Sequence, residues 1–164
     1  MTPEDKGNSV RATLDEPAVA TLVARVKAAA ANNTPLRIQG GGSKSFYGRS
    51  LKGETLDTRE LHGIVAYEPT ELVITARAGT PLAEIEETLA SHNQMLGFEP
   101  PHFDGGATIG GAVASGLSGP ARPYHGAARD FVLGVDVIDG RGELLSFGGQ
   151  VMKNVAGFDV ARLL

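Results

Sequence analysis

The sequence predicts a single α+β domain, and three observations support this fold class. The 164-residue chain is long enough to bury one core and too short for a separate catalytic domain. Helical and strand-like patterns are partly segregated, and strands outnumber helices in the second half. Several of the expected strands are joined by tight turns, which favours an α+β arrangement over a regularly alternating doubly wound sheet.

The first part of the chain predicts a polar lead-in, a helix and a short strand. Residues 1–14 are polar and unpatterned, so we expect them to form a flexible lead-in. A helix should begin with Asp15 or Glu16 as its cap and end at Asn32, because apolar residues recur at helical spacing between these positions. A strand over 36–39 then leads directly into a glycine triplet.

The second part predicts two hairpins with a helix between them. Residues 63–78 hold two apolar, β-rich runs around a turn, and strands over 131–138 and 143–147 flank another turn. The helix between the hairpins should be capped by Thr80 and Pro81. Its apolar face carries Leu82, Ile85 and Leu89.

Composition excludes several classes of function. Fifteen Lys and Arg against nineteen Asp and Glu leave a mildly acidic chain without the basic run of a nucleic-acid-binding protein. The chain has no cysteine, so redox chemistry would need an organic cofactor. The four histidines are well spread and predict no metal site. Because no stretch approaches the roughly 20 apolar residues of a membrane span, we expect a cytoplasmic protein.

The first candidate site is the segment 40–45, Gly-Gly-Gly-Ser-Lys-Ser. Glycines allow backbone N–H groups to converge on an anion, and Ser and Lys add donors and charge, which is typical of a phosphate-binding loop. The segment is not a Walker A loop, because Ser43 rather than glycine precedes Lys44, and the chain has no G-x-G-x-x-G. Two alternatives remain open: a plain exposed turn, and a lysine that points into solvent.

The second candidate site is the small-residue segment 105–116, which contains five glycines. Such a composition is explained by close approach of the backbone to something large and flat. A helix that starts after Thr108 could also direct its N–H groups at a phosphate. The alternative is tight packing of a glycine-rich helix against a sheet.

Four segments, in order and spacing, resemble the motifs of the PCMH-type, or vanillyl-alcohol-oxidase-type, FAD-binding domain. They are PLRIQGGGSKSFYG (35–48), GGATIGGAVASGLSG (105–119), ARDFVLGVDVIDGRGE (128–143) and KNVAGFDVARLL (153–164). The resemblance extends over 15–164 and implies two lobes, about 15–60 and about 61–164. Within this family the chain is similar to the smaller FAD-binding subunit of bacterial glycolate oxidase.

The resemblance also implies which residues bind the cofactor. The pyrophosphate loop would be Gln39, Gly40, Gly41, Gly42, Ser43 and Lys44. The second loop, beside the phosphates and the flavin, would be Thr108, Gly110, Gly111, Ser115 and Gly116. The adenosine side would be lined by Asp130 and Val132. Some family members tether the flavin through a histidine in the first loop, where this chain has glycine, so we expect non-covalent FAD.

The function implied by the resemblance is oxidation of a small 2-hydroxy acid, as in glycolate oxidation to glyoxylate, beside a sister FAD subunit and an iron–sulfur subunit. One alternative is a structural or electron-relay subunit with catalysis on the sister subunit; another is a nucleotide-phosphate binding module of a different kind. Such an assembly would be cytoplasmic or peripheral to the inner membrane through its partners.

We also expect the domain to be C-terminally incomplete. The family continues past the position of Leu164 into a closing strand turn and a cap domain, and Val160, Leu163 and Leu164 form an apolar stripe at the terminus. The chain is therefore interpreted as part of a longer protein that is inactive in isolation. No catalytic residue is assigned, because that cap carries most of the catalytic groups in the family.

Overall fold

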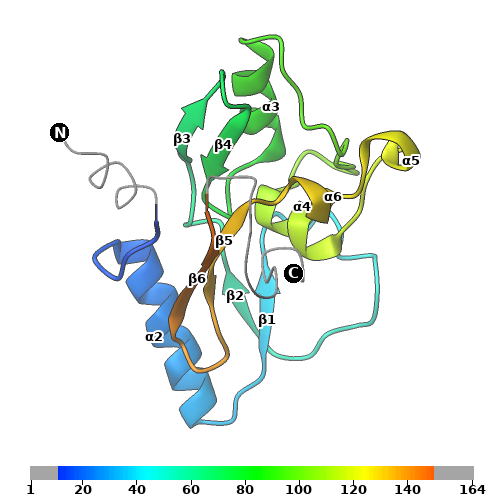
Figure 1. Cartoon of the computed structure of the whole chain (residues 1–164). Helices are drawn as coiled ribbons and strands as arrows, with labels where there is room; N and C mark the ends of the chain where they lie inside the picture. Colours follow the sequence, from blue (N-terminus) through cyan, green and yellow to red (C-terminus); the bar gives the residue numbers. More distant parts are fainter. Residues whose placement is uncertain (1–10, 150–164) are drawn as a thin grey trace, which may run out of the picture.

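A computed structural model describes residues 11–149 of the chain. This part contains three two-stranded β-sheets and the helices α2 to α6 (Figure 1). The mixture of helices and antiparallel hairpins confirms the α+β prediction. The motif at 153–164 and its apolar stripe lie outside the described residues. The division into two lobes stays a prediction.

The first helix forms as predicted. α2 spans Pro17–Ala31, follows Glu16 as N-cap, and buries Val19, Leu22, Val23 and Ala29. Instead of capping the helix, the Glu16 carboxylate accepts the N–H of Thr13 at 3.1 Å and pairs with Arg77 at 2.6 Å. Glu16 therefore joins the start of α2 to the chain that follows β4.

The predicted lead-in is partly joined to the fold. Ala12 donates its N–H to Asp136 at 2.7 Å, and Arg11 donates to the carbonyl of Gly148 at 3.0 Å. Both acceptors belong to the hairpin β5–β6. The expectation of a flexible lead-in is therefore wrong for residues 11 and 12, because distant acceptors that local sequence does not reveal bind them.

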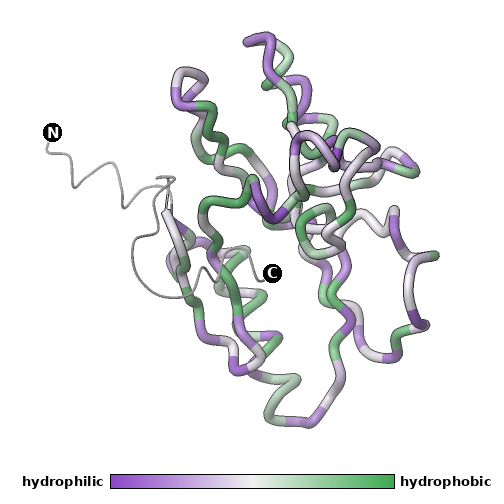
Figure 2. The backbone as a smooth tube through the Cα atoms, turned by 45° about the vertical axis from the view of Figure 1, so that its right-hand side comes forward, coloured by the Kyte–Doolittle hydropathy of each residue, from purple (hydrophilic) through white to green (hydrophobic). Residues whose placement is uncertain are grey.

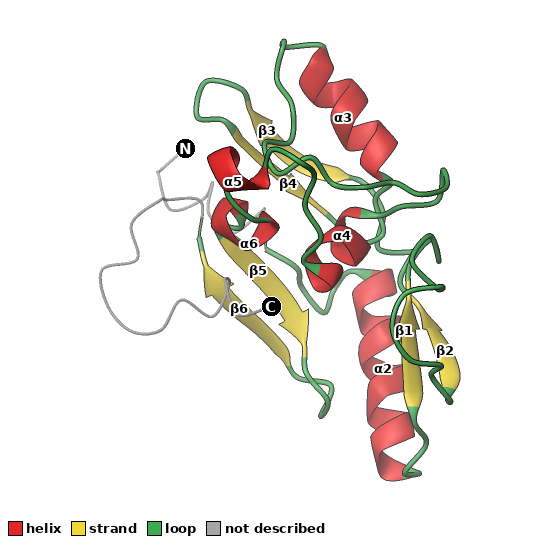
Figure 3. Ribbon diagram, turned by 90° about the vertical axis from the view of Figure 1, so that its right-hand side faces the viewer, coloured by secondary structure: helices red, strands yellow, loops and turns green. Residues whose placement is uncertain are grey.

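A parallel strand pair carries the first glycine segment. β1 (Leu36–Gln39) pairs in parallel with β2 (Glu54–Asp57), with Leu36 opposite Glu54 and Gln39 opposite Asp57. Parallel neighbours need a long crossover between them, and this crossover begins with the glycines at 40–42. The first candidate site therefore lies at the carboxyl end of β1. Figure 3 shows α2 alongside this strand pair.

The predicted hairpin and helix of the middle region are confirmed. β3 (Ile64–Glu68) pairs antiparallel with β4 (Val73–Ala76), and α3 (Leu82–Ala90) buries the expected leucine and isoleucine face. The prediction that Thr80 caps α3 is wrong. Its hydroxyl instead bonds to the N–H of Gly63 at 2.9 Å and to the carbonyl of Gly63 at 3.1 Å. Thr80 thereby joins the start of β3 to the start of α3.

The last hairpin forms, but it starts later than predicted. β5 (Gly134–Ile138) pairs antiparallel with β6 (Leu144–Gly148) around the expected turn. Phe131 ends the short helix α6 (Ala128–Phe131) instead of opening a strand. The Asp130 carboxylate accepts the N–H of Ala127 at 2.8 Å and so stabilises this helical turn. A short apolar run cannot by itself distinguish helix from strand.

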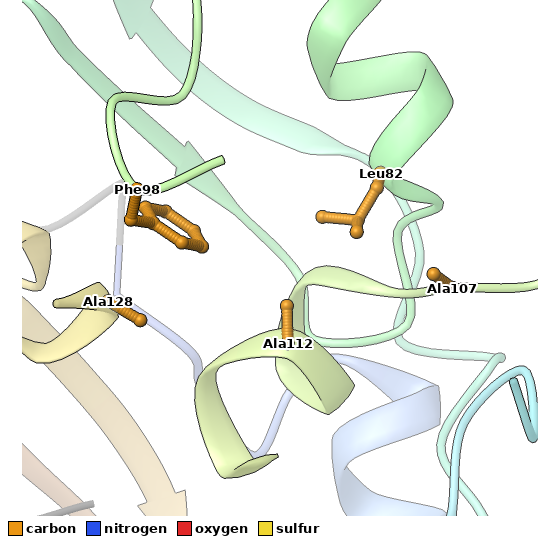
Figure 4. Packing of buried hydrophobic residues seen from close by; sticks show 5 residues of the cluster. All are labelled: Leu82, Phe98, Ala107, Ala112 and Ala128. Carbon is orange, nitrogen blue, oxygen red and sulfur yellow. The ribbon is translucent and has the colours of Figure 1, made fainter. Parts of the chain in front are cut away.

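The core behind the second glycine segment consists largely of small side chains. The short helix α4 (Ile109–Ser115) lies within that segment, and the short helix α5 (Arg122–His125) follows it. Figure 4 shows the buried cluster that α4 shares with α3, α6 and the chain before the segment. Its members are Leu82, Phe98, Ala107, Ala112 and Ala128. Because Ala107 and Ala112 belong to this core, the backbone between them is fixed by packing.

Apolar and polar residues alternate in short stretches along the described chain (Figure 2). In the region covered by the structure, no helix has both the length and the apolar character needed to cross a membrane.

Candidate functional site

The first glycine segment presents unpaired backbone donors. In the part of the chain that the structure describes, none of the five N–H groups of residues 40–44 donates to a backbone carbonyl. The segment is held instead through carbonyls, because Gly42 accepts from the N–H of Ser45 and Lys44 accepts from the N–H of Tyr47, each at 2.9 Å. Gly42 has φ +78°, a conformation that favours glycine. Consecutive free N–H groups in such a turn form an anion-binding concavity.

Lys44 adds an unpaired cation to this segment. Its ammonium Nζ is shielded from solvent and has no hydrogen-bond partner among the described residues. Burial lowers the pKa of Lys44 below its ordinary value, while the neighbouring carboxylate of Asp104 partly opposes this change. The alternative of a solvent-pointing lysine is therefore wrong. An ammonium without an acceptor beside free N–H groups is a donor set that suits a phosphate.

The structure brings the two glycine segments into direct contact. A Cβ atom on Gly41 would lie 1.4 Å from the carbonyl oxygen of Gly106. A Cβ atom on Gly40 would lie 2.6 Å from the hydroxyl oxygen of Thr108. These two glycines are therefore required by contact between the segments, whether or not a ligand is bound.

The second segment uses its donors inside the protein. At the start of α4, Ile109 donates its N–H to Thr80 at 3.0 Å, and Gly110 donates to Ala78 at 2.9 Å. The N–H of Gly111 donates to the hydroxyl of Thr108 at 3.3 Å. Protein acceptors thus already bind these three N–H groups, and the place of this helix start beside the phosphates stays a prediction.

Close packing explains the glycine at position 110, and local backbone geometry explains the residues that end α4. A Cβ on Gly110 would lie 2.7 Å from that of Ala78, so the helix packs tightly against the turn that follows β4 rather than against a sheet. The Ser115 hydroxyl donates to the carbonyl of Ala112 at 3.0 Å, and Gly116 ends the helix with φ +61°. The second segment thus provides the surface that the first segment contacts.

The FAD binding domain model matches residues 18–148, which is most of the chain. The chain belongs to this FAD-binding domain family. The match confirms the PCMH-type resemblance and gives FAD as the cofactor of the domain.

Relatives agree with this assignment. Glycolate oxidase subunit GlcE of Escherichia coli (strain K12) is 58% identical over 143 residues, which are 87% of this chain and 41% of that protein. Glycolate oxidase subunit GlcD of Bacillus subtilis (strain 168) is 37% identical over 111 residues, 68% of this chain and 23% of that protein. The chain thus spans less than half the length of these relatives.

Solved structures confirm the fold of this FAD-binding domain. A structure of alkyldihydroxyacetonephosphate synthase matches with a TM-score of 0.64 at 21% identity, and the match covers 87% of this chain and 26% of that one. At this level of sequence identity the similarity supports only a shared fold.

The first segment fits the diphosphate of FAD. Five N–H groups and an ammonium that have no partner among the described residues are complementary to a doubly charged, oxygen-rich group. Ser43 lies in the middle of the segment and is buried, so the backbone around it is held in place. Gln39 lies beneath the same turn, since its side-chain nitrogen would be 3.3 Å from a Cβ on Gly42. The residues present therefore suit the cofactor of this family.

Asp130 and Val132 occupy a different part of the FAD-binding domain. The Asp130 carboxylate bonds within the turn that starts α6, and Val132 is the half-buried residue that follows this helix. Neither is joined by a recorded hydrogen bond to residues 40–44 in the region that the structure covers. Their place beside the adenosine stays a prediction.

Two histidines form hydrogen bonds with glutamates of α3 on the surface of the domain. His62 lies 2.7 Å from Glu84, and His102 lies 3.0 Å from Glu86. Both pairs are partly exposed. Within residues 11–149, no group of three or more His, Cys, Asp or Glu side chains is arranged to hold a metal ion.

Sequence patterns did not identify two residues that lie beside Lys44. The Asp104 carboxylate attracts the Lys44 ammonium and so partly opposes the lowering of its pKa by burial, and the ammonium lies over the ring of Phe103. Their only sequence signal is their position directly before the second glycine segment, where contact with the first segment brings them to the site.

Proposed function

We propose that this chain holds FAD non-covalently and forms the FAD-binding part of a flavoprotein that oxidises a small 2-hydroxy acid such as glycolate. The observation that carries the proposal is the set of unpaired donors at 40–44 in a chain of the FAD-binding family. Bound FAD would supply the acceptor for the hydride equivalent that leaves the substrate.

In this proposal the first segment binds the diphosphate and the second segment supports it. The N–H groups of residues 40–44 donate to phosphate oxygens, and Lys44 offsets their charge. Thr108 and Gly106 hold the segment in shape through their contacts with Gly40 and Gly41. No side chain at 40–42 can form a bond to the flavin, because all three residues are glycine.

The test of cofactor binding is an absorbance spectrum of the purified protein before and after acid denaturation. Non-covalent FAD gives a flavin spectrum in the native protein, and the flavin stays in the supernatant when the protein precipitates. Flavin that precipitates with the protein would contradict non-covalent binding. A purified protein that neither contains nor takes up FAD would contradict the whole proposal.

The proposed substrate class rests on the 58% identity to a glycolate oxidase subunit. Its test is anaerobic addition of glycolate, and separately of D-lactate, to the flavin-loaded protein. Bleaching of the flavin absorbance by either acid supports direct oxidation. A flavin that dithionite reduces but neither acid bleaches argues against it.

A second candidate function is that of a structural or electron-relay subunit. It is favoured by the match to two differently named subunits of glycolate oxidases, GlcE and GlcD. Here a sister FAD subunit would oxidise the substrate and an iron–sulfur subunit would complete the assembly, in the cytoplasm or at the inner membrane. Flavin that glycolate bleaches only after a sister subunit is added would favour this second function.

A further inference from the structure

Phe103 adopts a backbone conformation that bulky residues rarely take. Its φ is +62°, in the left-handed region, and its side chain is 57% exposed. Burial therefore does not explain why an aromatic ring is held here. Residues kept in such sparsely populated conformations cluster at ligand-binding and active sites.

The ring of Phe103 lies against the first glycine segment. The ammonium Nζ of Lys44 is 5.7 Å from the centroid of this ring. The ring of Phe46 meets that of Phe103 edge-on, with centroids 5.0 Å apart and an interplanar angle of 79°. Phe46 follows Lys44 in the same turn, so the two aromatic residues and the lysine join both segments in one cluster.

Asp104 offers the ammonium an alternative partner. Its carboxylate is close enough to act on the charge of Lys44, yet Nζ has no hydrogen-bond partner within residues 11–149. Attraction to the face of an aromatic ring holds a cation without occupying its N–H donors. The ring can therefore keep the ammonium away from Asp104 and leave all three of its N–H bonds free.

We infer that Phe103 is a positioning residue, whose ring holds the Lys44 ammonium unpaired beside the glycine segment for the diphosphate of FAD. The inference deepens the proposed function and rests on it. The strained backbone at position 103 places the ring below the ammonium, and Phe46 fixes the orientation of that ring. The cluster thus organises the cation before the cofactor arrives, which lowers the cost of ordering it on binding.

The test is a double-mutant cycle on FAD affinity, with Phe103→Leu, Lys44→Met and the double variant compared with the parent. Leucine keeps a Cβ and apolar bulk, so the backbone strain is unchanged and only the π face is lost. We expect Phe103→Leu to weaken binding about threefold to thirtyfold in the parent, the range of one cation–π contact. In the Lys44→Met background the same change should alter affinity less than about twofold, because no cation remains.

Two control variants accompany the cycle. Phe103→Tyr keeps an aromatic face and should bind FAD like the parent. Tyr124→Leu removes an exposed aromatic ring from α5, where the residue is 89% exposed, and should leave FAD affinity unchanged. Thermal unfolding of the apoproteins checks that each variant is folded.

Equal weakening by Phe103→Leu in both backgrounds would overturn the inference, since the ring would then act on the cofactor or the fold without Lys44. Should Phe103→Leu fail to fold, Phe103→Met provides the same comparison in both backgrounds. Failure of the parent itself to bind FAD would overturn the proposed function together with this inference. Normal binding by the parent without coupling would overturn the inference alone.

Discussion

The two glycine segments have similar compositions and use their backbones in opposite ways. Within residues 11–149, residues 40–44 keep their N–H groups free of backbone acceptors and carry a lysine without a hydrogen-bond partner. Residues 109–111 donate all of their N–H groups to acceptors within the protein, and Gly110 is packed against Ala78. A glycine thus indicates that another group lies close to the backbone. Whether that group is a ligand or another part of the protein is shown only by which backbone N–H groups already have protein acceptors.

The largest effects should come from filling two close glycine contacts, that of Gly41 with Gly106 between the segments and that of Gly110 with Ala78. Gly41→Val and Gly110→Val both place a side chain where other backbone or Cβ atoms lie within 3 Å. Each should destabilise the fold by about 3 kcal/mol or more, because overpacking forces the backbone to shift. Thermal unfolding of the apoprotein measures this loss. An unchanged melting temperature in Gly41→Val would show that the two segments do not meet in this way, and one in Gly110→Val would show that α4 does not pack against Ala78 in this way.

Lys44→Met should separate binding from folding. We expect FAD affinity to fall roughly tenfold to a hundredfold, since charge-assisted hydrogen bonds contribute about 1.5–3 kcal/mol. The melting temperature of the apoprotein should not fall, because the ammonium has no hydrogen-bond partner among the described residues and its burial opposes the attraction of the Phe103 ring. Isothermal titration and thermal unfolding on the same samples test both parts. A variant that loses stability but keeps its affinity would contradict the role of the first segment.

The pH dependence of FAD binding should reflect the charge of the same lysine. Burial lowers the pKa of Lys44 below 10.5 in the folded protein, so its positive charge is lost at a lower pH than in the unfolded chain. FAD affinity should therefore be greatest below this lowered pKa and decrease as pH rises through it. Titrations of the parent and Lys44→Met from neutral to alkaline pH measure the difference. A decrease of the same size in both proteins would assign it to another group.

A smaller effect is expected at the base of the first segment. Asp57 ends β2 opposite Gln39, and hydrogen bonds from Arg59 lower its pKa to about 2. Because the folded pKa is lowered, this stabilisation is present above the unfolded value of 3.8 and is lost as pH falls toward 2. The pair is exposed, so Asp57→Asn should cost no more than about 1 kcal/mol at neutral pH. Urea unfolding at pH 7 and pH 3 should show a smaller difference between parent and variant at the lower pH.

The smallest effect is expected from Gly105→Ala. A Cβ at this position meets no atom within 4 Å, so neither the fold nor the contact between the segments should change. FAD affinity should also stay within about twofold of the parent, because the proposed phosphate donors lie in the first segment. Clear weakening in a fully stable variant would show that the cofactor also approaches the second segment closely.

Local patterns were sufficient to predict most of the elements. The apolar spacing that predicts α2 and the turn residues of both hairpins act over a few neighbouring positions, and the structure confirms them. β2 was not predicted, since Leu56 is its one buried residue and its pairing with β1 depends on distant chain. The late start of β5 follows from a side-chain contact of Asp130 that apolar patterning does not encode.

The candidate site was predictable only in part. Composition located both glycine segments, and the order of the motifs indicated the FAD-binding family. The acceptors that bind the N–H groups of Ile109 and Gly110 belong to Thr80 and Ala78, which lie far away in sequence. The same holds for the position of Phe103 beside Lys44. Which donors remain free is a property of the folded arrangement, so no local pattern could reveal it.

The contact between Gly41 and Gly106 also sets an order of events during synthesis. The first segment leaves the ribosome well before the residues that support it, so its final shape must wait until the second segment has been made. Cofactor capture should therefore be a late step that secures an already assembled pair of loops. Amide hydrogen exchange around position 106 should then slow when FAD binds at 40–44, because opening either loop would require release of the other.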